Sequence, residues 1–166
     1  MLLLQATVAA AYVYFTPEAI REEYFPGQAV ETVRWTPDVA EVAWLRDQLG
    51  YALPRPEYDI VVGHDDAGAP AWAVFDEQLG QHEPISLATL VDERFAVARV
   101  EVMVYREAYG DGVRAPAFRQ QFDGLDVSNR MRPGKEIRIV SGATISTRAL
   151  SLAVRRACAL VQAFAS

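Results

Sequence analysis

The sequence is poor in cysteine and in basic charge. Its one cysteine, Cys158, has no partner for a disulfide bond or a metal cluster. It falls on the apolar side of a predicted helix, where a buried thiol packs as a small hydrophobic residue. Acidic residues outnumber basic residues by 22 to 16, which gives a net charge of −6. Because nucleic-acid binding depends on neutralising phosphate groups, this balance argues against a nucleic-acid partner and favours a small cofactor or a protein partner.

Several common catalytic motifs are also missing. The chain has neither a Walker phosphate loop nor the glycine pattern of a dinucleotide-binding turn. Ser141 has no nucleophile-elbow setting, so we do not expect a hydrolase. His64 lies in a polar turn with no metal-ligand spacing around it, and we expect no metal site. His82 and Glu83 have no second histidine, cysteine or cluster of acids nearby, so we interpret them as loop-shaping residues rather than as an acid-base pair.

The uncharged stretch at the start of the chain is short for a transmembrane helix. Residues 1–15, MLLLQATVAAAYVYF, would rise about 22 Å as a helix, less than the ~30 Å hydrocarbon core of a bilayer. They resemble the apolar core of a signal peptide, although no Lys or Arg stands at the start. We therefore predict a signal or anchor segment over residues 1–15 and one domain over residues 16–166. A partly buried N-terminal helix is the alternative.

Two helix starts have the same pattern, a threonine followed by a proline and an acid. Thr16-Pro17 predicts a helix over 17–24, and Thr36-Pro37 predicts a helix over 37–49, each capped by its threonine. Gly50 supplies the stop for the second helix.

The middle of the chain has the pattern of strands. We predict strands over 58–63, 71–75, 84–90 and 96–107, joined as two hairpins. In the last strand, alternation puts residues 98, 100, 102 and 104 on one dry face that belongs to the core. With helices at both ends, this order predicts an α+β fold: a single domain of antiparallel β-hairpins packed against N- and C-terminal helices.

The C-terminal third ends in a helix with an apolar stripe. Before it we predict a glycine-containing loop over 108–112, a short amphipathic piece over 116–122 and a short strand over 136–140. Ser146 or Thr147 is predicted to cap the helix. Arg155 and Arg156 fall off the stripe, whose members are Leu150, Ala153, Val154, Ala157, Leu160, Val161 and Phe164.

The run Ser141-Gly142-Ala143-Thr144 precedes this helix. Free backbone amides, the positive end of the helix dipole and nearby hydroxyl groups together make an anion site. Hydroxyl-rich helix starts are also ordinary caps, so these residues alone leave both interpretations open.

A resemblance adds to this pattern. The motif SGATISTRAL (141–150) is similar to the flavinylation motif of the FMN-binding domain family, which includes flavin subunits of Rnf and sodium-pumping NADH:quinone oxidoreductase complexes and small exported electron carriers. Three further blocks are similar to the short members of the family and come in the same order: residues 18–26, FDEQLGQHEPIS (75–86) and VEVMVYREAYGDGVRAPAFRQQFDG (100–124). The family's flavin transferase joins the phosphate of FMN to the threonine that corresponds to Thr144.

The resemblance implies an exported FMN electron carrier on the periplasmic or extracytoplasmic side of the membrane. Its implied partners are a flavin transferase and membrane or periplasmic redox proteins, and its N-terminus would anchor or export it. Alternatives are a flavin-free scaffold subunit and a small flavin-dependent reductase. The flavin site would comprise the helix start, the loop before it and a second wall, with these residues: Arg138, Ser141, Gly142, Ala143, Thr144, Ser146, Thr147, His82, Glu83, Arg106, Glu107, Tyr109, Gly110 and Gly112.

One position departs from the family pattern. The family usually has an acid three residues before the serine of the motif, where this chain has Arg138. The change would slow or prevent covalent attachment if the acid assists the transferase. Alternatively, Arg138 would add a charged donor to the FMN phosphate.

Overall fold

The computed structural model describes residues 12–166, and it is built on one six-stranded antiparallel sheet. The strand order is β1-β6-β5-β4-β3-β2, so every neighbouring pair except β1 and β6 is consecutive in the chain. The strands are β1 (Tyr12–Val13), β2 (Glu31–Trp35), β3 (Tyr58–His64), β4 (Pro70–Leu79), β5 (Pro84–Val91) and β6 (Val97–Tyr105). Together with the helices at both ends, this sheet confirms the α+β prediction for a single domain.

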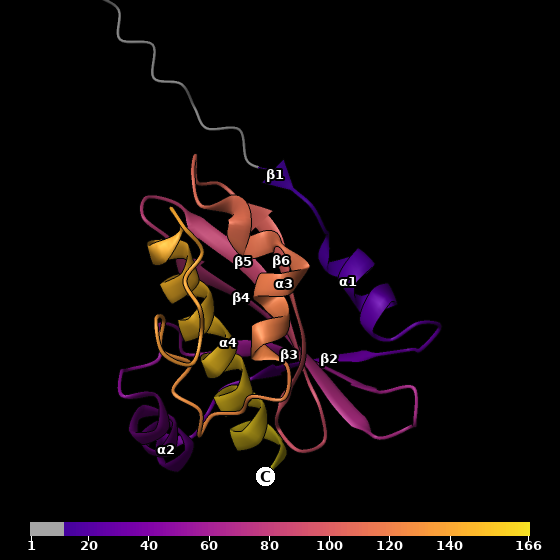
Figure 1. Cartoon of the computed structure of the whole chain (residues 1–166). Coiled ribbons are helices and arrows are strands. Elements are labelled where there is room, and N and C mark those ends of the chain that lie inside the picture. The colour runs from indigo at the N-terminus through magenta and orange to yellow at the C-terminus, as the bar shows by residue number, and fades with distance from the viewer. Residues whose placement is uncertain (1–11) are drawn as a thin grey trace, which may run out of the picture.

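The long C-terminal helix α4 (Thr144–Ala165) packs across β4 and β5, and α2 (Val39–Leu49) packs beside it (Figure 1). The short helices η1 (Asp111–Arg114), α3 (Pro116–Arg119) and η2 (Gln120–Phe122) lie against β6 on the same side. The main core forms between this layer and the sheet. Leu150, Ala153, Val154, Ala157 and Leu160 are all fully buried there, so the predicted apolar stripe is confirmed.

The opposite face of the sheet is also covered, which the sequence did not predict. Helix α1 (Pro17–Tyr24) packs there, and its Ile20 and Tyr24 form a second core with Met103 of β6. The prediction of one dry face on β6 was therefore wrong. Irregularities in the pairing of β5 with β6 fall at the steps Ser86/Leu87 and Leu90/Val91, and they break the alternation at both ends of β6.

The helix starts are confirmed for α1 and corrected for α2. The Thr16 hydroxyl accepts a hydrogen bond from the Ala19 amide at 3.2 Å, as its pattern predicted. In α2 the cap is Asp38 rather than Thr36, because Asp38 and Glu41 form a reciprocal capping box that begins the helix at residue 39. Gly50 ends α2 in the left-handed conformation, as expected.

Two predictions near the C-terminal helix were wrong. Residues 136–140 form no strand; only a single bridge joins Ile137 to Pro133, because a turn over 132–137, held by an Arg132–Glu136 ion pair, occupies this segment. Helix α4 begins at Thr144, and Ser146 and Thr147 lie buried in its first turn instead of capping it. The cap residue is Ala143, whose side chain cannot accept a hydrogen bond.

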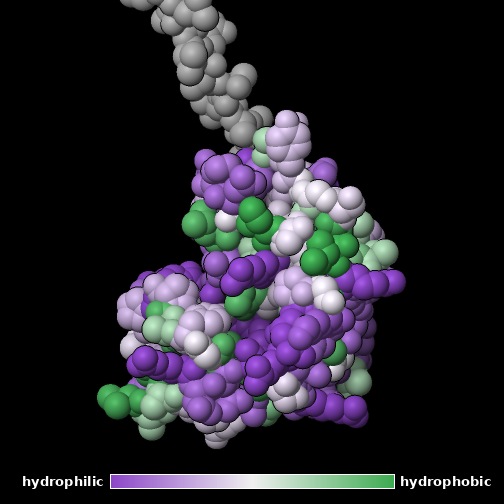
Figure 2. Space-filling model, turned by 60° about the vertical axis from the view of Figure 1, so that its left-hand side comes forward, coloured by the Kyte–Doolittle hydropathy of each residue, from purple (hydrophilic) through white to green (hydrophobic). Residues whose placement is uncertain are grey.

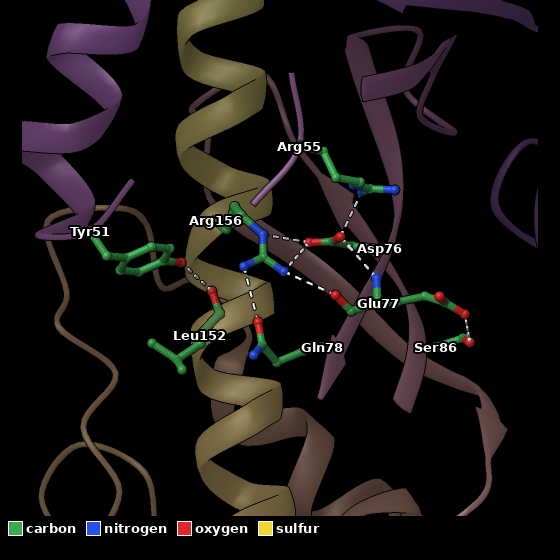
Figure 3. Close-up of polar contacts among 8 residues, drawn as sticks. All are labelled: Tyr51, Arg55, Asp76, Glu77, Gln78, Ser86, Leu152 and Arg156. Carbon is green, nitrogen blue, oxygen red and sulfur yellow. Dashed lines mark hydrogen bonds and ion pairs between the residues drawn. The ribbon is translucent and has the colours of Figure 1, made fainter. Parts of the chain in front are cut away.

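A buried ion pair joins α4 to β4 and corrects the placement of Arg156. This residue was predicted to lie off the apolar stripe, yet it is 1% exposed. Its guanidinium donates to Asp76 Oδ2 at 2.6 and 2.7 Å, to Gln78 Oε1 at 3.0 Å and to the Glu77 carbonyl at 3.3 Å (Figure 3). Arg55 donates to the other oxygen of Asp76 at 2.7 Å. The buried charges are thus paired and hydrogen-bonded, as burial requires.

The N-terminal prediction lies largely outside the described residues, which begin at Tyr12. Tyr12 and Val13 pair with Tyr105 and Val104 at the edge of the sheet, and the Tyr14 amide donates to the Met103 carbonyl at 2.8 Å. Within residues 12–166, no helix combines the length and the apolar character needed to cross a membrane. The export or anchoring of residues 1–15 stays a prediction.

Candidate functional site

The start of α4 presents Thr144 to solvent. Gly142, with φ +73°, turns the chain, and the Ala143 amide closes the turn on the Val140 carbonyl at 2.9 Å. The next three amides, from Thr144 to Ser146, have no hydrogen-bond partner within residues 12–166. Because α4 has no side-chain cap, these amides and the helix dipole are available to an anion at this end.

The loop after β6 packs tightly against this helix start. Tyr105 donates its hydroxyl hydrogen to the Tyr109 carbonyl at 2.6 Å, so Ser146 is the donor in the 2.8 Å contact between the two hydroxyl groups. Burial raises the pKa of Tyr105 and keeps it protonated, although its contact with Ser146 acts in the opposite direction. Gly110 lies directly over this pair with φ +88°, and a Cβ there would come within 2.8 Å of Tyr105 Oη and 2.9 Å of Ser146 Oγ.

Glu107 holds a second loop beside the first. Its Oε1 accepts the backbone amides of His82 at 2.6 Å and Glu83 at 3.1 Å, which ties the turn between β4 and β5 to the end of β6. Burial works to raise the pKa of Glu107, but these amides outweigh it and lower the pKa. The carboxylate therefore holds the loop in position, which agrees with the interpretation of His82 and Glu83 as loop-shaping residues.

These three segments enclose a cavity of about 420 Å³ with Thr144 at its border. This volume is in the range of small-molecule sites. Seven of the fourteen predicted site residues line the cavity. The complete lining is Gln81, His82, Glu107, Ala108, Tyr109, Gly142, Ala143, Thr144, Ile145 and Ser146.

Other predicted residues lie near the cavity without lining it. Ser141 precedes the turn and is exposed, and Gly110 and Glu83 act through the contacts described above. Gly112 packs against Val140, where a Cβ would come within 2.7 Å of Val140 Cγ1. Thr147 is fully buried behind the helix start, and its hydroxyl has no partner within residues 12–166.

The structure places the two predicted arginines elsewhere. Arg106 donates to the Pro84 carbonyl at 3.1 Å and to Ser86 Oγ at 3.2 Å, on the side of the sheet covered by α1. Arg138 bonds to Gln121 Oε1 through its amide at 2.9 Å and through Nε at 3.2 Å. In this arrangement, neither arginine reaches the cavity at Thr144.

Sequence reasoning missed three residues that line the cavity: Gln81, Ala108 and Ile145. Each lies next to a predicted site residue in the sequence. This adjacency, rather than the chemistry of the side chain, could have identified them. Residues 12–166 contain no group of three or more His, Cys, Asp or Glu side chains that could hold a metal ion.

Comparison with known proteins connects this geometry to a family. Residues 80–159 match the sequence model of the FMN-binding domain, and this segment contains the cavity and Thr144. This part of the chain belongs to the FMN-binding domain family. The resemblance inferred from the sequence is thereby confirmed. No curated protein matches the chain.

A solved structure has a similar fold to this chain. It is one of the subunits of the Na⁺-translocating NADH-quinone reductase from Parabacteroides distasonis, with a TM-score of 0.57 over 90% of this chain and 82% of that chain. The sequence identity is 15%, so the likeness concerns the fold.

Proposed function

We propose that this protein is an exported electron carrier whose FMN is joined to Thr144 through a phosphoester. The observation that carries the proposal is the position of Thr144, an exposed hydroxyl on the first residue of an uncapped helix at the border of a 420 Å³ cavity. Membership of residues 80–159 in the FMN-binding domain family supports the cofactor. The fold shared with a reductase subunit supports a role beside membrane redox proteins.

The residues around Thr144 fit an attached flavin phosphate. The unpaired amides of residues 144–146 and the dipole of α4 favour the remaining negative charge of a phosphodiester. Gly142 puts no side chain beside the acceptor hydroxyl, so a transferase can approach the backbone closely.

The cavity beyond Thr144 has room for the flavin ring system, with Tyr109, Ala108 and Ile145 as its apolar surfaces. When bound, FMN supplies one- or two-electron chemistry that the side chains themselves lack. The role of the protein is to hold, orient and expose the cofactor. The Tyr105–Ser146 contact and the Glu107 carboxylate keep the two walls in position.

The proposal includes export through residues 1–15, modification by a flavin transferase outside the cytoplasm, and exchange of electrons with membrane or periplasmic proteins. Arg138 stands where the family usually has an acid. Because its side chain bonds to Gln121, we propose that Arg138 does not contribute to phosphate binding. We also propose that Arg138→Asp leaves the rate of FMN attachment equal to that of the wild type or raises it.

Co-expression with a flavin transferase tests the covalent bond. We expect the tryptic peptide that contains Thr144 to gain the mass of FMN less water. We also expect Thr144→Ala to abolish all flavin that survives denaturation, and Ser141→Ala, at the exposed residue before the turn, to retain it. An unmodified wild-type peptide, under conditions that modify a control domain, would refute covalent attachment. It would leave a carrier of non-covalent FMN or a flavin-free scaffold, which the absorbance of the native protein distinguishes.

A further inference from the structure

Thr144 borders a second cavity on the other side of the α4 start. This groove has a volume of about 430 Å³ and lies between the first three turns of α4, the loop over 130–139 and Tyr51. Four arginines line it, and none of the described acidic residues does. Figure 2 turns this side of the molecule forward and shows a hollow with hydrophilic residues around it. The lining residues are Tyr51, Arg130, Met131, Arg132, Pro133, Ile139, Thr144, Arg148, Ser151, Leu152 and Arg155.

The positive charge of this groove is mostly uncompensated. Arg130 and Arg148 are exposed, and neither makes an ion pair or a side-chain hydrogen bond within residues 12–166. Arg155 donates to three backbone carbonyls, those of Gln48, Leu49 and Val127, and forms no ion pair with a carboxylate within residues 12–166. Among the four arginines, Arg132 has a carboxylate partner, Glu136 at 2.7 Å.

The charge extends beyond the groove itself. Residues 130–148 hold five basic residues and one acidic residue, a net charge of +4, while the whole chain has a net charge of −6. Lys135 and Arg138 carry the charge along the loop that forms one wall. A single phosphate or a small carboxylate needs far less surface than this. A distributed positive patch in an acidic protein is typical of a face that attracts a negatively charged partner.

We propose that this arginine groove is the docking site for an acidic segment of a partner protein that exchanges electrons with the flavin. The proposal rests on the proposed function, because it is the position of Thr144 on the shared border that would bring such a partner next to the cofactor. Guanidinium groups bind carboxylates in a bidentate geometry, and the apolar residues that line the groove accept the apolar side chains between them; they are Met131, Pro133, Ile139 and Leu152. Docking there leaves the flavin cavity itself free.

A labelled acidic peptide tests the groove directly. Binding of fluorescein-labelled octaglutamate to the full-length protein is measured by fluorescence anisotropy at increasing salt. We expect Arg148→Glu to raise Kd about fivefold at low salt, Arg130→Glu to act in the same direction, and the difference to shrink as salt screens the charges. The matched control is Arg94→Glu, which changes the net charge equally at an 83% exposed side chain outside the groove. This control is expected to leave Kd within about twofold of the wild-type value.

Further measurements separate this proposal from its competitors and from the proposed function. The peptide measurement uses protein expressed without a flavin transferase, so the groove can be tested even if no flavin is attached. Equal Kd values for wild type and Arg148→Glu, with both folded by thermal melt, would overturn the proposal. So would displacement of the peptide by micromolar inorganic phosphate, which indicates a small anion site. Arginine-dependent binding to phosphatidylglycerol vesicles without binding of the peptide would indicate a membrane surface instead.

Discussion

Removing the Asp76 carboxylate is expected to destabilise the protein more than removing its arginine partner. The side chains of Asp76 and Arg156 are each 2% exposed. In Asp76→Ala, the Arg156 charge stays buried with two neutral acceptors, Gln78 Oε1 and the Glu77 carbonyl. Leaving a buried charge without its partner costs about 3–5 kcal/mol. In Arg156→Met, Asp76 keeps Arg55 at 2.7 Å and the Glu77 amide at 2.9 Å, so we expect a loss of about 1–2 kcal/mol.

Urea denaturation of the purified variants measures this difference. With an m-value of about 2 kcal/mol per molar urea, a loss of about 4 kcal/mol lowers the midpoint by about 2 M. The decisive variant combines Asp76→Ala with Arg156→Met, because it removes both buried charges. We expect this double variant to be more stable than Asp76→Ala alone. If the two losses instead add, or if Arg156→Met costs more than Asp76→Ala, the explanation by an unpaired buried charge is wrong.

Two further predictions concern the site and the core. Gly110→Ala puts a Cβ within 2.8 Å of Tyr105 Oη at φ +88°. We therefore expect thermal unfolding to show a loss of about 1–3 kcal/mol in stability, and we expect weaker binding of FMN. The control is Gly68→Ala, at φ +80° with no atom within 4 Å of its Cβ, which measures the cost of the backbone conformation alone. Burial raises the pKa of Cys158 to about 12, so the native thiol is expected to resist a thiol reagent at pH 8 and to react in urea. Because this pKa is higher in the folded state, the stability that it contributes is present below the unfolded value and is lost as the pH rises toward 12. Rapid reaction of the native thiol would show that α4 opens more readily than its burial implies.

Local signals were sufficient for most of the secondary structure. The Thr16-Pro17 pair specified the start of α1, and strand-like runs separated by polar turns identified the strands of both hairpins. The start of α2 was misplaced because two caps competed within three residues, and the capping box of Asp38 and Glu41 supplies one more hydrogen bond than Thr36 offers. Strand β2 pairs with β3 at the edge of the sheet and has no alternation strong enough to be noticed in the sequence.

The remaining errors concern contacts between distant parts of the chain. Asp76 and Arg156 are separated by 80 residues, and no sequence pattern around Arg156 indicates that it pairs with a carboxylate on β4. The second core beneath α1 was missed for the same reason, since it requires knowing which face of the sheet the helix covers. The candidate site was predicted from its motif, whereas the separation of Arg106 and Arg138 from the cavity depends on partners in other elements.

If FMN is joined to Thr144 as proposed, the position of this residue on α4 also links flavin attachment to the completion of folding. Helix α4 follows the whole sheet in the chain, and its main contacts are with β4 and β5, far back in the sequence. Contacts of such long range form late, because the closure entropy of the intervening loop must be overcome first. A chain that has made its hairpins but has not yet docked α4 has no cavity beside Thr144. Flavin attached to this threonine would therefore mark molecules that have finished folding, and a transferase that requires the docked helix would act as a check on the maturation of its substrate.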